Sequence, residues 1–253
     1  MPEDVERRVL GAFRCVDAVT RIQVMDPVVV QSDQLDVRRN ASQMWVVFDA
    51  PGMYELTTQF EVTSAWPAAR GFEVSVRSIS RRYLPRRANV NVPRKLAAMS
   101  DPDSIMVPQD VVLYPAPTAS TLPSWALLRV WVTRNNSDEG LAWAVVRVTR
   151  SSDQSLLATG MSNENGDALL AVPGLGVSAS QNGGGAVSES TIDVDVAAFW
   201  EDPGQQKRPA SWIPDPDVIL NDLGNSKWKK FALPQPVKIG RGTLSKLKLP
   251  IAA

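Results

Sequence analysis

Residues 140–173 alternate between apolar and polar side chains, and two turn signals interrupt the alternation. They read GLAWAVVRVTRSSDQSLLATGMSNENGDALLAVP, with SSDQ and NENGD at the turns. A period of two residues is the pattern of a half-buried strand and does not fit a helix. Asn165-Gly166 adds a strong hairpin signal, because a type I′ turn needs positive φ at both central residues. The stretch therefore predicts a meander of three β-strands.

The same punctuation continues along the whole chain. Nineteen prolines and fifteen glycines among 253 residues divide the chain into short segments, as strands joined by turns require. A chain of this length can bury one large core or two ordinary ones. We therefore predict a mainly β protein made of two tandem antiparallel β-sandwich domains with a C-terminal extension.

Changes in composition set the predicted domain boundaries. Residues 1–98 alternate as strands and are predicted to form an N-terminal β-sandwich. Residues 99–123 contain five prolines and are predicted to be a linker, although the inner piece DVVLYP fits a strand of either domain. Residues 124–200 are predicted to form the second sandwich. Residues 201–253 are predicted to be an extended basic arm that either completes this domain or docks on a partner.

Charge and hydrophobicity limit the class of protein. Lys plus Arg (27) balance Asp plus Glu (27), so no global field favours nucleic acid or a membrane surface. No apolar run approaches the roughly 18 residues that a membrane-spanning helix needs. The N-terminus MPEDVERRVL is unlike a signal peptide, and the single cysteine, Cys15, fits a reducing compartment. We expect a soluble cytoplasmic protein with no membrane partner and no nucleic-acid partner.

The residue types needed for common catalytic chemistry are sparse. The chain has no histidine, which removes the usual general base and the commonest metal ligand. Cys15 sits in an alternating strand beside Phe13, which favours a buried thiol over a nucleophile. Asp193 and Asp195 share one face of a predicted strand, and a solvated face is favoured over cation ligands or glycosidase acids. We expect no enzymatic activity, no metal and no cofactor, with a carboxylate-only hydrolase as the remaining enzymatic alternative.

The first candidate partner-binding surface is a basic segment in the N-terminal domain. No acidic residue occurs from 74 to 100, and Tyr83 lies among arginines and could stack on a base. The balanced net charge instead favours a solvated sheet edge or a surface for an acidic protein. The candidate residues here are Arg81, Arg82, Arg86 and Arg87.

The second candidate surface is the tryptophan-bearing, basic C-terminal segment. Its tryptophans fall outside the compact strand pattern, as expected of anchors that bury against the chain's own sandwiches or a neighbouring subunit. A row of exposed tryptophans on a sandwich face would instead suit sugar stacking. The candidate residues are Trp200, Trp212, Trp228, Lys229, Lys230, Phe231, Lys238 and Arg241.

A family resemblance is carried by seven residues at the start of the second domain: Ala144, Val146, Thr159, Ser162, Asn165, Gly166 and Leu170. They match the pattern gA-x-V-x-V, followed by a-x-T-d-x-x-G-x-f-x-l-x-x-l-p-x-G, of the carboxypeptidase-regulatory, transthyretin-like β-sandwich family. Ser162-Asn163 stands where that family usually has Thr-Asp. The resemblance implies a sandwich fold, and its motifs specify a turn geometry rather than a catalyst.

The N-terminal domain shows the same order of strand, turn, strand, and a strand ending in APG, so it is predicted to be a diverged copy. A two-copy arrangement of this type resembles accessory structural proteins of phage-tail-like contractile injection systems. This resemblance implies a cap, collar or baseplate accessory within a cytoplasmic particle.

These observations together favour a non-enzymatic structural or adaptor subunit of a multiprotein assembly. Its expected partners are other protein subunits, reached through the C-terminal arm, or further copies of the same chain. The alternative function is a carbohydrate- or surface-binding β-sandwich module.

Overall fold

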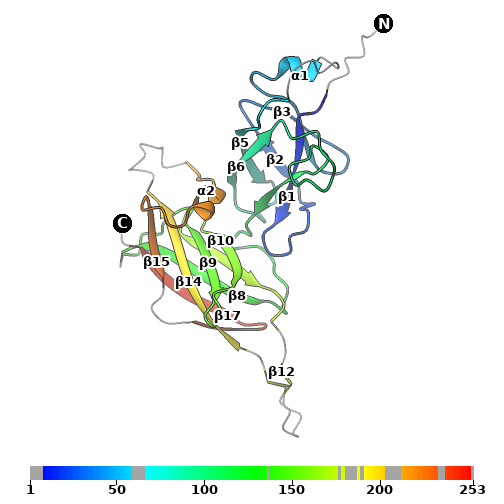
Figure 1. Ribbon diagram of the computed structural model, residues 1–253. Coiled ribbons are helices and arrows are strands. Elements are labelled where there is room, and N and C mark those ends of the chain that lie inside the picture. Colours follow the sequence, from blue (N-terminus) through cyan, green and yellow to red (C-terminus); the bar gives the residue numbers. More distant parts are fainter. Residues whose placement is uncertain are drawn as a thin grey trace. The chain divides into compact units, whose positions relative to one another are not determined.

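The computed structural model describes residues 8–58, 66–135, 137–175, 178–179, 187–188, 191–202, 212–232 and 237–251 (Figure 1). The chain divides into two compact units, with the boundary between Leu113 and Tyr114. The short segments 18–20 and 81–84 group with the second unit. The described residues are mainly in β-strands, so the predicted fold class is confirmed.

The first unit contains seven strands and one short helix within its described residues. They are β1 (Gly11–Asp17), β2 (Val28–Gln31), β3 (Asp36–Arg39), β4 (Trp45–Asp49), α1 (Tyr54–Thr58), β5 (Arg70–Ser78), β6 (Arg86–Val92) and β7 (Gln109–Leu113). One sheet has the order β3-β4-β1-β7 and the other has the order β2-β5-β6. The pairs are antiparallel except for β1 with β7, which is parallel.

The second unit contains a larger sandwich, again counted over its described residues. Its elements are β8 (Ala126–Arg134), β9 (Val145–Arg150), β10 (Leu156–Met161), β11 (Asp167–Val172), β12 (Ser178–Ala179), β13 (Val187–Ser188), β14 (Thr191–Glu201), α2 (Pro216–Asn221), β15 (Trp228–Ala232), β16 (Val237–Gly240) and β17 (Leu244–Ile251). One sheet runs β10-β9-β14, with β15 and β16 both paired to β14, and the other runs β11-β8-β17. β12 and β13 form a separate two-stranded ladder (Figure 1).

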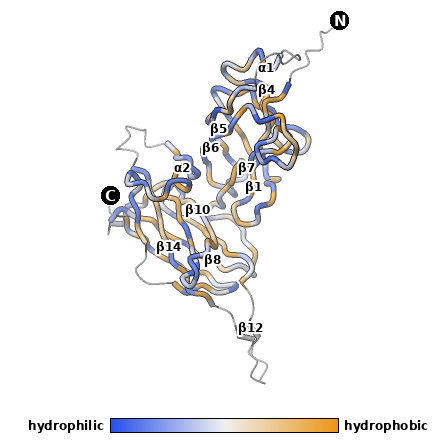
Figure 2. The backbone as a smooth tube through the Cα atoms, viewed as in Figure 1, coloured by the Kyte–Doolittle hydropathy of each residue, from blue (hydrophilic) through white to orange (hydrophobic). Residues whose placement is uncertain are grey.

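Strand alternation builds each core. In β5, Phe72, Val74 and Val76 are buried while the residues between them are exposed, as a period of two requires. In β8, Leu128, Val130 and Val132 face the core of the second unit in the same way. Hydrophobic and hydrophilic stretches alternate along the strands of both units in Figure 2.

The two units share one strand order. In each, the first strand lies between the fourth strand, which is antiparallel to it, and the last strand, which is parallel to it. When the separate β12–β13 ladder is left out of the count, the second strand of each unit pairs with the fifth, and the fifth pairs with the sixth. The third strand differs, because β3 pairs with β4 whereas β10 pairs with β9. A diverged copy of this kind is what the sequence predicts for the N-terminal domain.

A Pro-Gly pair follows the fourth strand in both units. Gly52 has φ 77° and Gly174 has φ 75°, conformations that favour glycine. In the first unit the Met53 amide donates to the Ala50 carbonyl oxygen at 3.0 Å, which closes the turn around this pair. The repeated turn chemistry agrees with the repeated strand order.

The predicted three-strand meander is wrong. β10 pairs with β9, but β11 pairs with β8 in the opposite sheet, so the turn around Gly166 crosses between sheets. Gly166 has positive φ (84°) whereas Asn165 does not, which excludes a type I′ turn. The Asn163 side-chain oxygen instead accepts from the amides of Asn165 and Asp167, both at 2.9 Å. The crossing follows from burial, since Ala168–Val172 are buried without alternation.

Two predicted boundaries also change. The first half of the predicted linker, residues 99–123, belongs to the first unit, because β7 pairs with β1 over five residues. The predicted arm, residues 201–253, contributes β15, β16 and β17, which pair with β14 and β8. The sequence left two roles open for the arm, and these pairings correspond to the first of them, completion of the second domain. Among the residues that the structure describes, neither helix has the length and apolar character needed to span a membrane.

Candidate functional site

Two of the predicted tryptophan anchors are buried within the second unit. Trp200, 4% exposed, ends β14 and donates its indole N–H to the Ala142 carbonyl oxygen at 3.1 Å. Trp228 donates to the Asp222 carbonyl oxygen at 2.7 Å and packs in a small apolar cluster beneath α2. Both indoles therefore bury against the chain's own sandwich, one of the two alternatives that the sequence left open.

The other residues of the predicted C-terminal surface lie around β15 and β16. Lys230 is exposed, and its Nζ lies 5.5 Å from the centroid of the Phe199 ring. Lys238 is exposed and stands opposite Asp193 across the β14–β16 pair. The remaining members are half-buried Lys229, half-buried Phe231, half-buried Trp212 and exposed Arg241.

The basic segment of the first unit is only partly a surface. Arg86 was predicted to be exposed, but it is 1% exposed, and its Nη1 donates to the Val112 carbonyl oxygen at 2.6 Å. Its inward position follows from the register of β6, whose alternate residues face the core. Arg87 points to the other side and pairs with Glu73 at 3.1 Å. Arg81 and Arg82 remain exposed.

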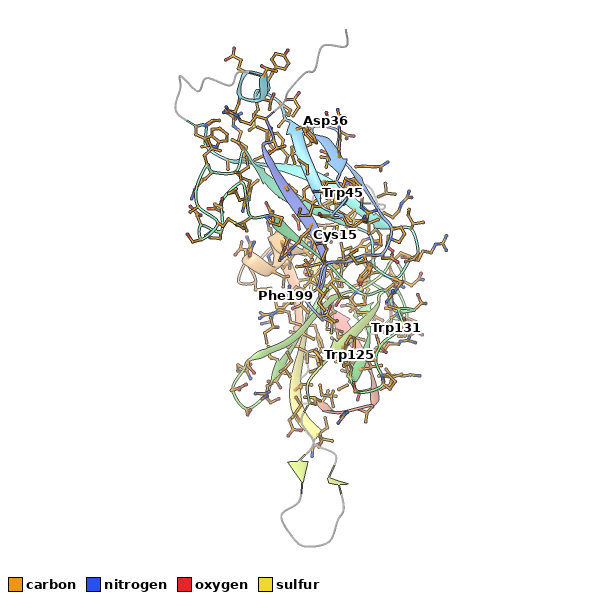
Figure 3. The ribbon with its side chains drawn as sticks, turned by 90° about the vertical axis from the view of Figure 1, so that its right-hand side faces the viewer. Cys15, Asp36, Trp45, Trp125, Trp131 and Phe199 are labelled. Carbon is orange, nitrogen blue, oxygen red and sulfur yellow. The ribbon has the colours of Figure 1, made fainter. Side chains whose placement is uncertain are left out.

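Asp195 of the acidic pair and Cys15 both have surroundings that account for them without catalysis. Asp195 accepts hydrogen bonds from the Ser151 hydroxyl and the Gln154 amide, both at 2.9 Å. Cys15 is buried in the first unit (Figure 3), and burial raises the pKa of its thiol to about 12. Across the described ranges no group of three or more Cys, Asp or Glu side chains is placed to hold a metal ion.

A pocket of about 160 Å³ lies at one end of the second unit, and we call it the tryptophan pocket. Three separate chain segments form it: the end of β8 with the loop that follows, the end of β14, and the segment before α2. Its lining residues are Arg134, Glu139, Gly140, Leu141, Ala142, Trp143, Trp200, Glu201, Trp212 and Pro214.

Hydrogen bonds fix the loop that forms one wall of this pocket. The buried Ser162 hydroxyl donates to the Leu141 carbonyl oxygen and accepts from the Ala144 amide, both at 2.8 Å. A side chain at Gly140 would place its Cβ 1.9 Å from the Asn165 carbonyl oxygen, so this close approach requires glycine. Trp143 lies between these contacts with φ 64°, a strained conformation for a bulky residue.

The pocket contains both signs of charge. The Arg134 guanidinium pairs with Glu139 at 3.2 Å and lies 5.4 Å from the centroid of the Trp200 ring. Glu201 contributes a second carboxylate from a position that is largely buried. The charged residues of the lining are therefore two carboxylates and one guanidinium.

A second feature, which the sequence analysis missed, is a loop of the first unit at residues 93–107, here called the apolar loop. Arg94 anchors its base: the backbone amide donates to the Leu10 carbonyl oxygen at 2.7 Å, and Nη2 donates to the carbonyl oxygen of Pro102. The fully buried Ser104 hydroxyl donates to the Ala97 carbonyl oxygen at 2.7 Å. Lys95 adds an ion pair with Asp103 and one with Asp101.

The outside of the apolar loop carries three large exposed hydrophobic side chains. Leu96 is 60% exposed, Met99 is 69% exposed and Met106 is 64% exposed. In the sequence these residues are separated by Ala, Ser, Asp, Pro and Ile, and Pro102 interrupts any strand or helix period, so periodicity could not single them out. The loop thus combines a fixed base with an apolar exterior.

Comparisons with known proteins add a general likeness. No protein-family model matches the chain, and no curated protein matches it. Among solved structures it is similar to BcpA, the major pilin subunit of Bacillus cereus, with 10% identity over 100% of this chain and 62% of that chain, at a TM-score of 0.26. It is also similar to a streptococcal ancillary pilin, with 9% identity over 98% and 63% of the two chains and a TM-score of 0.22. A third neighbour is the shaft pilin spaA of Lactobacillus rhamnosus GG, with 9% identity over 97% and 98% and a TM-score of 0.22.

The chain therefore spans less than two thirds of the length of BcpA. These solved structures are pilin subunits. TM-scores of this size carry no argument about what this chain does.

Proposed function

We propose that this protein is a non-enzymatic structural or adaptor subunit of a multiprotein assembly, and that it docks on a neighbouring protein subunit through the apolar loop. The observation that carries the proposal is the contrast within that loop. Its base is fixed by the buried side chains of Arg94 and Ser104, while Leu96, Met99 and Met106 face outward. Fixed loops on a rigid scaffold are common carriers of binding residues, and grouped exposed apolar side chains mark interaction sites.

The size of the apolar surface suits a central contact of an interface. Fully burying a fully exposed Leu or Met side chain stabilises by about 1.5–3 kcal/mol. Because these three are about two thirds exposed, their burial supplies roughly 3–6 kcal/mol before the costs of association. Because hydrogen bonds already order the loop, docking loses little conformational entropy there. Methionine adapts well to an irregular partner surface, which suits the two exposed methionines.

The finer part of the proposal concerns the assembly. We propose a tail-like contractile particle in the cytoplasm, with this chain as a cap, collar or baseplate accessory. Support comes from the two-copy sandwich layout, which resembles accessory proteins of such particles, and from the strand order and Pro-Gly turn that the two units have in common.

The test is co-purification of the full chain from the native cells with Leu96→Ser, Met99→Ser and Met106→Ser combined. The matched control combines Leu122→Ser and Leu156→Ser, two exposed apolar residues of the second unit outside the loop. We expect structural subunits of one assembly to co-purify with the wild type and the control and to be lost with the loop variant. Sheath, tube or baseplate proteins would support the contractile particle, and an unchanged set of partners with the loop variant would refute docking through the loop.

Deleting residues 224–253 is not a clean test of partner binding. The deletion removes β15, β16 and β17, and β17 pairs with β8 over eight residues. Lost binding would then report an unfolded sandwich rather than a lost contact.

A second candidate function is a ligand-binding β-sandwich module, which the tryptophan pocket favours. A pocket of about 160 Å³ is smaller than the roughly 300–1,000 Å³ of sites for drug-sized ligands, so a row of stacked sugars does not fit it. Trp131 on β8 (Figure 3) is engaged within the unit, since its indole donates to the Asn165 carbonyl oxygen and Lys248 Nζ lies 5.0 Å from its ring centroid. A glycan array would test sugar binding, and binding that vanishes in Trp212→Ala, a half-buried tryptophan of the pocket lining, would support it.

A further inference from the structure

We propose that the tryptophan pocket binds an organic cation of the ammonium class, either a free small amine or the side-chain ammonium of a lysine. Three indoles from separate segments, Trp143, Trp200 and Trp212, line one small cavity. Indole faces attract cations more strongly than other aromatic side chains do. This inference does not depend on the apolar loop, which belongs to the other unit.

The pocket already holds one cation of its own against an indole. The Arg134 guanidinium carbon lies 5.4 Å from the centroid of the Trp200 ring, within the range of a cation–π contact. Arg134 is also paired with Glu139 at 3.2 Å, so its charge is compensated locally. The surroundings therefore stabilise a positive charge next to an aromatic wall.

The charge of the lining also favours a cation over a neutral or anionic ligand. Glu139 and Glu201 carry two negative charges against the single positive charge of Arg134. Glu201 lies in a largely buried position, where a carboxylate interacts more strongly with charge than it does in water.

The volume sets the size of the ligand group. A cavity of about 160 Å³ is smaller than the roughly 300–1,000 Å³ of sites for drug-sized ligands, so it suits a small group. A quaternary ammonium head or the end of a lysine side chain is such a group.

The pocket wall is held in a costly conformation. Trp143 has φ 64°, a conformation that is costly for a bulky residue and persists only where its surroundings enforce it. Ser162, through its two hydrogen bonds to the loop, and Gly140, through its close approach to residue 165, enforce it here. Backbone strain of this kind is concentrated at binding sites, which agrees with a pocket formed in advance of its ligand.

The test measures binding to the full chain by tryptophan fluorescence and calorimetry with matched probes. Choline and Nα-acetyl-lysine methylamide are the cationic probes, and 3,3-dimethylbutan-1-ol is the neutral isostere of choline. We expect at least one cationic probe to bind at least about tenfold more tightly than the neutral isostere, as a cation–π contact with charge compensation requires. Tighter binding of choline indicates a free amine as the source, and tighter binding of the lysine probe indicates a partner's lysine.

Variants separate this site from nonspecific effects. Glu201→Gln removes one charge at constant shape and should weaken the cationic probes without affecting the neutral one. Trp125→Phe changes an indole of the same unit that does not line the pocket, so it should leave binding unchanged. Equal affinity for choline and its neutral isostere, or no binding of either cationic probe to the wild type, would overturn the proposal whatever the variants do.

Discussion

Replacing Ser162 by alanine tests the packing of the second unit most sharply. The Ser162 hydroxyl is fully buried and makes two hydrogen bonds of 2.8 Å, one to the Leu141 carbonyl oxygen and one from the Ala144 amide. Ala144 and Leu141 are themselves buried, so water cannot replace the lost hydroxyl. The substitution leaves the Ala144 amide and the Leu141 carbonyl oxygen without the partner that Ser162 supplies. Each orphaned group costs about 1–3 kcal/mol, and we expect Ser162→Ala to lower the free energy of unfolding by roughly 2–6 kcal/mol.

Ser137→Ala is the matched control for this prediction. The Ser137 hydroxyl makes the same pair of bonds, donating to the Arg134 carbonyl oxygen at 2.6 Å and accepting from the Glu139 amide at 3.2 Å, but at an exposed turn. Water replaces both partners there, so the loss should stay below about 0.5 kcal/mol. The contrast isolates burial as the cause.

Urea unfolding of the full chain followed by tryptophan fluorescence measures both variants. The signal reports mainly the second unit, because it contains Trp125, Trp131, Trp143, Trp200, Trp212 and Trp228, whereas the first contains Trp45 and Trp66. The two units can unfold in separate transitions, so each transition is fitted on its own. Equal losses for the two serines, or a loss below about 0.5 kcal/mol for Ser162→Ala, would refute the reasoning.

Three further predictions follow from individual residues. Arg86→Ala should destabilise the first unit by about 3 kcal/mol in urea unfolding, because it removes a buried donor to the Val112 carbonyl oxygen. Arg77→Ala, at an exposed position of the same unit, should change the free energy of unfolding by less than about 0.5 kcal/mol. Gly140→Ala should lower the thermal midpoint of the second unit strongly, because its Cβ would meet backbone at 1.9 Å; Gly224→Ala, with nothing within 4 Å, should leave it unchanged. The buried Cys15 thiol, with its pKa raised from 9.0 to about 12, should resist a thiol reagent at neutral pH until the chain unfolds. Because the pKa of the Cys15 thiol is higher in the folded chain than in the unfolded chain, the thiol's contribution to stability is complete below pH 9.0 and is lost as the pH rises toward 12. Urea unfolding measured at several pH values in that window would show this loss.

The strands were largely predictable from the sequence, because a period of two marks a half-buried strand without reference to its neighbours. β5 and β8 follow that pattern through their buried residues. The partners of each strand were not predictable, since alternation says which face is buried and nothing about which strand lies beside it. For this reason the segment around Gly166 was predicted to be a hairpin, although it joins two sheets.

The candidate surfaces were harder to predict for a related reason. Arginine is usually exposed, so a cluster of arginines indicates a surface, yet the register of β6 turns Arg86 inward, where a backbone carbonyl accepts its hydrogen bond. The pocket tryptophans Trp143, Trp200 and Trp212 lie on segments far apart in the chain, and only the fold brings them to one cavity. The exposed residues of the apolar loop carry no periodic signal at all.

The central claim, docking through the apolar loop, is tested most directly by site-specific crosslinking in the native cells. The photoreactive residue p-benzoylphenylalanine is placed at Met99, and in a control at Leu122, which is also exposed and apolar but lies outside the loop. The account predicts that position 99 crosslinks to one defined structural subunit and that position 122 does not. Crosslinks from neither position, or the same products from both, would contradict it.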